Sequence, residues 1–277
     1  MKRLSWLLSI TIFVLVIYSF FSERDTGKSL ITKAQQGGQS QQSTPVASSP
    51  SAPPPVEKPV PVAEAITQPW PPALKGDESL PLANSLTQKN YVLILDGSGS
   101  MSKSQCSGNL SKNEVAKQAV IEWASLIPND ANLGLVVFDR SGFSIRLPLG
   151  LNNRENFRQE VGKVVPDYQT PLAMALDTAY SMLTEQGRKQ LGYGEYTVVV
   201  VTDGAADDIK ALERSVNMVL TSSPVMIYTI GFCIASDHSL NRQGRTIYRA
   251  ANNPAELRQG LQDVLAESES FDISGFK

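Results

Sequence analysis

The chain has 277 residues and a net charge of −2, with 42% apolar and 19% charged residues. This composition allows a substantial core, and the lack of a basic surplus argues against a nucleic-acid-binding protein. The single histidine, His238, excludes a metal site built from several histidines, and the wide spacing of Cys106 and Cys233 excludes a zinc knuckle. A bound metal ion would therefore be held by oxygen ligands.

The N-terminus carries Lys2 and Arg3 ahead of an uncharged, apolar run over residues 4–21. As a helix this run would reach about 27 Å, close to the hydrocarbon thickness of a bilayer. No small-x-small cleavage site follows it, so we expect residues 1–22 to form an uncleaved transmembrane signal-anchor rather than a cleaved signal peptide or a buried core helix. The positive flank should stay in the cytoplasm, which would place the rest of the chain on the exported side of the cytoplasmic (inner) membrane, periplasmic or extracellular.

Residues 23–87 are rich in Gln, Ser and Pro and show no apolar periodicity. Eleven of the chain's 17 prolines lie between Pro45 and Pro81. Proline at this density removes backbone donors and blocks helix formation, which indicates a disordered, solvated linker that tethers the C-terminal part of the chain. A proline-rich ligand for another domain is the functional alternative.

From residue 88 onward, short apolar runs alternate with helical patterns. Strands buried on both faces are predicted over 92–95, 133–138, 197–201 and 225–230, with weaker strands over 143–147 and 246–248. Helices are predicted to begin near Ser111, Asn152, Pro171, Asp207 and Asn253, the first with an S-x-x-E capping box that includes Glu114. This alternation is typical of an α/β domain with a doubly wound, mostly parallel sheet covered by helices on both faces. We assign residues 88–268 to this domain and residues 269–277 to a short tail.

The first buried strand leads directly into a D-x-S-x-S sequence formed by Asp96, Ser98 and Ser100. Ligand sites of parallel α/β sheets lie beyond the carboxyl ends of the strands, so this loop would direct three oxygen groups at one point. Two interleaved glycines allow the backbone to fold tightly around a small ion. The simpler interpretation is a polar strand-to-helix turn in which Asp and Ser act as caps.

Two further features favour a binding site. The strand over 197–201 leads into Thr202-Asp203-Gly204, which puts a second carboxylate at the end of another buried strand. Thr170 precedes Pro171 at a predicted helix start. Separately, Asp203 could be a turn-starting aspartate and Thr170 a helix N-cap. The combination of all three features makes coincidence a poor explanation.

The D-x-S-x-S loop, the Thr-Pro-Leu helix start and the Thr-Asp-Gly strand end together resemble a von Willebrand factor type A domain with a complete metal-ion-dependent adhesion site. The resemblance implies a six-stranded sheet in the order 3-2-1-4-5-6, with the site where strand 1 meets strand 4. It also implies that Ser98, Ser100 and Thr170 offer hydroxyls to a metal ion, while Asp96 and Asp203 reach the ion directly or through water. Little room remains for a helix between Cys233 and the strand near Thr246, unlike in longer members of the family.

The donor set suits Mg²⁺ or Mn²⁺, and Ca²⁺ should substitute poorly because it prefers more ligands at longer distances. We expect the ion to act as a clamp on an Asp or Glu carboxylate of a protein partner, without catalysis. One alternative is a phosphoryl-transfer hydrolase with Asp96 as nucleophile, but such sites need a second acid where this chain has Ser98. The other alternative is a structural scaffold whose metal site is unused.

A few residues around this site carry further expectations. Cys106 and Cys233 would emerge on the same face of the domain, so a disulfide between them is an expectation that export would permit. Met101 and Phe143 are interpreted as core or rim packing, and His238 as a loop residue near the site. Asp203 is expected at an exposed strand end, where its removal would leave the fold intact.

Overall fold

The computed structural model describes residues 69–74, 79–234, 236–242 and 245–269, all within the compact unit Lys58–Lys277. The predicted signal-anchor, most of the predicted linker and nearly all of the predicted tail lie outside the described residues. Within the described part, none of the helices is both long and apolar enough to cross a membrane.

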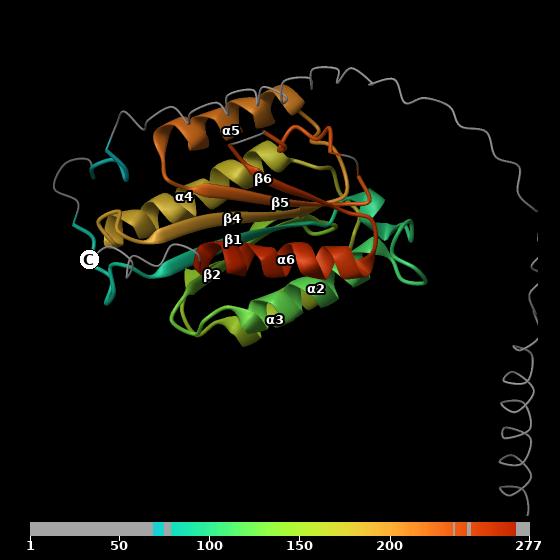
Figure 1. The fold of residues 1–277 in the computed structure, drawn as a ribbon, viewed down its shortest axis with the longest axis horizontal. Helices are drawn as coiled ribbons and strands as arrows, with labels where there is room; N and C mark the ends of the chain where they lie inside the picture. Colours follow the sequence, from blue (N-terminus) through green and yellow to red (C-terminus); the bar gives the residue numbers. More distant parts are fainter. Residues whose placement is uncertain (1–68, 75–78, 235, 243–244, 270–277) are drawn as a thin grey trace, which may run out of the picture. The chain divides into compact units, whose positions relative to one another are not determined.

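The domain is built on a six-stranded sheet in the order β3-β2-β1-β4-β5-β6 (Figure 1). All neighbouring strands pair in parallel except β2 and β3, which are antiparallel. The strands are β1 (Lys89–Asp96), β2 (Asn132–Asp139), β3 (Gly142–Gly150), β4 (Glu195–Thr202), β5 (Met226–Phe232) and β6 (Ile247–Ala251). The predicted fold class, strand order and both weaker strands are confirmed.

The central strands are apolar on both faces because helices cover the sheet on both sides. In β1, Tyr91 and Leu93 pack into one core cluster, and Val92 and Ile94 pack into the other. All four side chains are at most 1% exposed. In a strand with both faces buried, apolar and polar residues do not alternate, which explains why the sequence of β1 is a continuous apolar run.

Figure 1 shows α4 and α5 on one side of the sheet and α2, α3 and α6 on the other. The helices are α2 (Lys112–Leu126), α3 (Arg154–Gly162), α4 (Leu172–Lys189), α5 (Ile209–Ser222) and α6 (Pro254–Glu269), and the short 3-10 helix η1 (Gly99–Ser102) follows β1. Between β5 and β6 the described residues contain no helix, as the sequence predicted. The chain runs from β1 through α2 to β2 on one side and from β4 through α5 to β5 on the other, so the strand order reverses between β1 and β4. Ligands of such sheets bind at the carboxyl ends of the strands at this point.

The helix starts are confirmed for α2 and α6 and corrected for α3 and α5. Ser111 and Glu114 form the predicted capping box of α2. The helix α3 is preceded by Asn153 rather than Asn152, and the Asn153 amide instead donates to the carbonyl of Leu133 at 2.6 Å. The cap of α5 is Asp208 rather than Asp207, and the Asp208 carboxylate accepts from the backbone N–H of Ala211.

The segment before β1 packs against the domain, which corrects the prediction of a solvated linker up to residue 87. The Trp70 ring lies edge-on to Tyr196, with 4.6 Å between ring centroids. It also covers Gly187 of α4, where an added Cβ would lie 2.5 Å from the indole. The Gln190 side chain, fully buried, donates to the carbonyls of Leu86 and Gln88. Sequence patterns missed this contact because one tryptophan in a proline-rich stretch has no periodicity.

We expect Trp70→Ala in the full chain to lower the free energy of unfolding by about 2 kcal/mol, because it removes a half-buried aromatic side chain from a surface shaped by Gly187. Tyr193→Ala is a matched control, since Tyr193 is an aromatic residue near the same end of the domain that is 69% exposed. The control should change stability by no more than about 0.5 kcal/mol. Urea unfolding measures both, and equal effects of the two substitutions would refute a structural role for Trp70.

Candidate functional site

The predicted site residues lie at the carboxyl ends of β1 and β4, where the strand order reverses. Leu95 of β1 is paired with Val201 of β4, so the next residues, Asp96 and Thr202, reach the same level of the sheet. The Thr202 hydroxyl donates to Asp96 Oδ2 at 2.5 Å. This bond ties together the ends of the two strands that carry the predicted ligands, and its donor, Thr202, had no role in the sequence-based prediction.

Asp96 is fully buried, and protein donors engage both of its oxygens. The backbone N–H of Ser98 donates to Asp96 Oδ1 at 2.7 Å, while Thr202 holds Oδ2. Burial, with a smaller contribution from the nearby Asp203, raises the pKa of Asp96 to about 6, although the hydrogen bonds from Ser98 and Thr202 lower it. Because burial disfavours the charged form of this carboxylate, a nearby positive charge would stabilise it.

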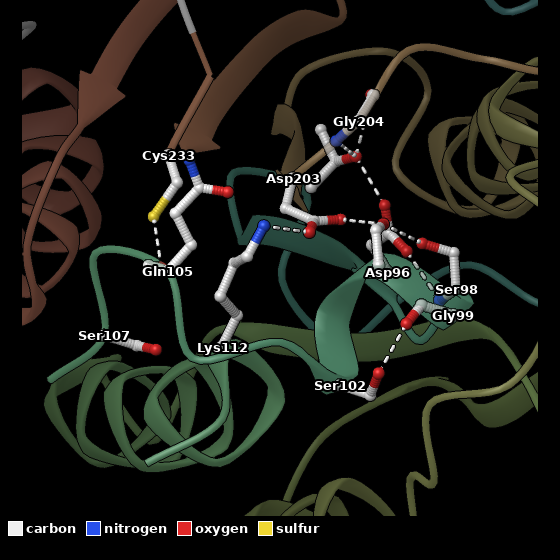
Figure 2. Close-up of polar contacts among 12 residues, drawn as sticks. Asp96, Ser98, Gly99, Ser102, Gln105, Ser107, Lys112, Asp203, Gly204 and Cys233 are labelled. Atoms are coloured by element: carbon white, nitrogen blue, oxygen red, sulfur yellow. Dashed lines mark hydrogen bonds and ion pairs between the residues drawn. The ribbon is translucent and has the colours of Figure 1, made fainter. Parts of the chain in front are cut away.

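A continuous chain of polar contacts links the remaining residues of the two loops (Figure 2). The hydroxyls of Ser98 and Ser100 are 3.0 Å apart. Ser100 donates to Asp203 Oδ1 at 2.6 Å, and the Lys112 ammonium donates to Asp203 Oδ2 at 2.5 Å. The structure therefore brings together four of the five predicted ligands, Asp96, Ser98, Ser100 and Asp203, around the ends of two neighbouring strands.

The environment of Asp203 differs from the predicted one. The sequence placed it at an exposed strand end, but the residue is 5% exposed, and the side chains of Asp203 and Lys112 are 0% and 5% exposed. Replacing Asp203 by alanine would leave the Lys112 ammonium buried without its partner, which costs stability. The expectation that the fold is indifferent to this substitution is therefore wrong, and hydroxyl substitutions are the cleaner probes of the site.

Thr170 is held beside the D-x-S-x-S loop by backbone contacts on both sides. The carbonyl of Tyr168 accepts from the backbone N–H of Gly99 at 3.1 Å. The backbone N–H of Thr170 donates to the Asp207 carboxylate at 2.8 Å, and the Thr170 carbonyl accepts from the N–H of Asp207. The cap position of α4 is Pro171, without a side-chain capping bond. The interpretation of Thr170 as a side-chain N-cap is therefore wrong.

Asp139, at the end of β2, supports this loop from the other side. Its buried carboxylate accepts from the Arg146 guanidinium at 2.6 Å and from the backbone N–H of Val165 at 3.1 Å. Gly97 lies so close to this strand end that a Cβ there would approach the Asp139 Cβ and the Phe138 carbonyl to 2.7 Å. The glycine in the D-x-S-x-S loop thus permits close packing against β2, in addition to any freedom it gives the turn.

His238 contacts the Thr202–Gly204 loop after β4 rather than facing solvent. Its Nε2 lies 2.9 Å from the Gly204 carbonyl, and Nδ1 accepts from the backbone N–H of Leu240, so Nε2 carries the proton and donates. Desolvation lowers the pKa of His238, which favours this neutral form. His238 therefore positions the Thr202–Gly204 loop. Met101 is completely buried and Phe143 packs at the edge of the core, as predicted.

The two cysteines lie near each other beside the site, as free thiols. The Cys233 thiol donates to the carbonyl of Gln105, the residue before Cys106, at 2.9 Å (Figure 2). Burial, together with the neighbouring Cys106, raises the pKa of Cys233 to about 12. Both residues have positive φ angles, 59° for Cys106 and 63° for Cys233. The predicted proximity holds, and the disulfide itself stays a prediction.

The donor set fits a small divalent cation. Mg²⁺ prefers oxygen ligands, and the hydroxyls of Ser98 and Ser100 lie together, 3.0 Å apart and in hydrogen-bond contact. In the described part of the chain, no group of three or more His, Cys, Asp or Glu residues is arranged to hold a metal. Any ion bound here would therefore rely on the hydroxyls as well as on Asp96 and Asp203.

Comparison with known proteins agrees with this architecture. Residues 91–205 match the family model of the von Willebrand factor type A domain. The pilus adhesin SpaC from Lactobacillus rhamnosus GG superimposes with a TM-score of 0.55 at 15% identity, over 68% of this chain and 31% of SpaC. A von Willebrand factor type A protein from Catenulispora acidiphila gives 0.55 at 18% identity, over 66% of this chain and 43% of that protein. A mutant of the PilB minor pilin from Streptococcus sanguinis gives a TM-score of 0.55 at 12% identity, over 68% of this chain and 62% of the pilin.

These likenesses concern the fold, because the identities are low, and the chain spans less than two thirds of the length of each of the three structures. No curated protein matches the chain in sequence. The family match begins in β1 and ends just beyond Asp203, so it includes every predicted ligand. Over residues 91–205, and in its 3-2-1-4-5-6 strand order, the chain is therefore similar to a von Willebrand factor type A domain.

Proposed function

We propose that this domain binds one Mg²⁺ or Mn²⁺ ion through Asp96, Ser98, Ser100, Thr170 and Asp203, and that it uses the ion to hold an Asp or Glu carboxylate of a protein partner. The proposal rests above all on the contact chain from Ser98 through Ser100 to Asp203 at the carboxyl ends of β1 and β4. These contacts gather hydroxyl and carboxylate oxygens from two separate loops at one place.

The residues of the site would have distinct tasks. Ser98, Ser100 and Thr170 would supply neutral oxygens, and Asp96 and Asp203 would supply negative charge. An ion held mainly by neutral oxygens remains electron-poor and can accept a further carboxylate at an open position. Thr202 and His238 would act indirectly, since Thr202 orients Asp96 and His238 holds the Gly204 carbonyl.

A binding role fits the geometry better than catalysis. A hydrolase with Asp96 as nucleophile would need a neighbouring acid to serve as proton donor. The position of that second acid holds Ser98, whose hydroxyl cannot do this work well. The similarity in fold to SpaC, which is named a pilus adhesin, also supports a binding role. A scaffold with an unused site is the second candidate, and metal titration separates it from the first.

We further propose that the domain is displayed on the exported side of the cytoplasmic membrane. The support is the run over residues 4–21 behind Lys2 and Arg3, with no cleavage site after it. The proline-rich stretch up to Trp70 would then be a tether between the membrane and the domain.

Ser100→Ala should weaken Mn²⁺ and Mg²⁺ binding roughly tenfold or more, because it removes one ligand of a small set. The matched control is Ser102→Ala, since Ser102 lies in the same 3-10 helix and its hydroxyl donates only to the Gly99 carbonyl at 2.7 Å among its described contacts. This control should bind the ion like the wild type. Titration calorimetry of the wild type and both variants measures the effect.

The same three proteins test the partner clamp. Capture of a protein partner should require the divalent ion, should be reversed by chelator and should be lost in Ser100→Ala but not in Ser102→Ala. If the wild-type domain binds no divalent ion, or capture continues unchanged in excess chelator, the clamp is wrong and the scaffold takes its place.

The membrane proposal predicts that the mature protein keeps residues 1–22 and sediments with membranes. Protease added to the exported side should digest the domain, while Lys2 and Arg3 stay protected. N-terminal sequencing of the mature protein checks the first point, and a sequence that begins beyond residue 21 would mean a cleaved signal peptide and a released protein.

Export to an oxidising compartment would allow Cys106 and Cys233 to form a disulfide. In protein isolated from its native compartment and unfolded without reductant, we expect thiol labelling to find no free thiol. A Cys106→Ser variant serves as the positive control, because it should show one free thiol, from Cys233. Two labelled thiols in the wild type would exclude the bridge.

A further inference from the structure

Lys112 brings a positive charge into the site that the von Willebrand factor type A motif does not include. It is the first residue of α2, and its position is set by the Ser111 capping box and by its backbone N–H, which donates to the Lys103 carbonyl at 2.8 Å. From there the side chain extends to Asp203 (Figure 2). The ammonium and the Asp203 carboxylate are 2.5 Å apart, with side chains 5% and 0% exposed.

This ion pair leaves Asp203 with both oxygens engaged by the protein itself. Oδ2 accepts from Lys112 and Oδ1 accepts from Ser100. The hydroxyl of Ser100 is in turn the neighbour of the Ser98 hydroxyl. The two serine ligands, one carboxylate ligand and the lysine therefore form one connected group, and a change at its cationic end reaches the ligand hydroxyls.

The charges of this group limit what a divalent ion gains by binding. Asp96 and Asp203 together would neutralise the two positive charges of such an ion, but Lys112 already neutralises one of the carboxylates. An ion coordinated by Asp203 would also lie within a few ångströms of the ammonium, in a place where little water screens the repulsion. Any contact that the ion makes with Asp203 would therefore weaken the ion pair between Asp203 and Lys112.

We propose that Lys112 is a built-in competitor of the divalent ion for Asp203, and that it sets the metal affinity of the domain. This inference rests on the proposed metal site. The lysine holds Asp203 when the ion is absent, and the ion binds by weakening or displacing this pair. The consequence is a site that loads at higher free metal concentration than its five oxygen ligands alone would require, and that stays folded when it is empty.

A purely structural ion pair would behave differently. It would add stability to the loops without opposing the ion, so that removing the lysine would destabilise the domain and would leave metal affinity unchanged or weaker. Competition instead requires the affinity to rise when the positive charge is removed. The direction of the change in affinity therefore separates the two roles.

The test compares Lys112→Met with Lys117→Met in the full chain. Lys117 lies on the same helix and donates to the Gly162 carbonyl at 3.0 Å, so the control removes an equal charge from α2 outside the site. We expect Lys112→Met to bind Mn²⁺ and Mg²⁺ roughly tenfold or more tightly than the wild type, because the uncompensated Asp203 attracts the ion. Lys117→Met should bind like the wild type. Calorimetric titration with each metal measures affinity, and the metal-induced rise in melting temperature should be larger for Lys112→Met.

Lys112→Gln covers the case in which the methionine variant does not fold without metal, since its amide can still donate to Asp203 but carries no charge. Tighter binding by either variant supports the proposal. Wild-type binding together with equal or weaker binding by the folded variants would overturn the role of Lys112 and leave the metal site intact. Failure of the wild type and the variants alike to bind any divalent ion would overturn the metal site itself, and the competition with it.

Discussion

The parallel pairing of β1 with β4 is the constraint on which the rest of the domain depends. These two strands are neighbours in space although more than ninety residues separate them in the chain, and their register brings Asp96 level with Thr202. The helices that follow the two strands, α2 and α5, lie on opposite faces of the sheet (Figure 1), so the loops after the strands diverge at the place where such sheets bind ligands. The hydrogen bond from Thr202 to Asp96 then closes the pairing at its carboxyl end. Without this register the two carboxylate-bearing loops would not meet.

Burial of charge is the second physical theme of the site. Asp96 and Asp203 are both nearly inaccessible to water, and the protein stabilises each of them differently. Asp96 is surrounded by neutral donors, and its pKa is raised to about 6 because burial outweighs them. Asp203 instead has an ammonium partner in Lys112. The two carboxylates therefore differ in how much they would gain from an added cation, with Asp96 the less compensated of the two.

The packed segment before β1 fixes the end of the sheet at which the chain enters the domain. Trp70 lies against Tyr196 near the start of β4, whereas Asp203 follows the end of the same strand. The chain thus reaches the domain near the amino end of the sheet, about 20 Å along β4 from the proposed site.

The sequence predicted the fold class and the candidate ligand residues, because both follow from local signals, whereas the strand order was implied by the resemblance to the von Willebrand factor type A domain. Runs such as 92–95 and 197–201 are apolar on both faces wherever they are placed, and the D-x-S-x-S loop is contiguous. The contacts of Lys112 and Trp70, in contrast, could be found only from the folded domain. Lys112 and Asp203 form an ion pair although they are 91 positions apart in the chain. Trp70 packs against Gly187, although the proline-rich sequence around Trp70 predicts a solvated segment. A single long-range contact adds no period or spacing to the sequence, so it becomes visible only when the sheet brings its two partners together.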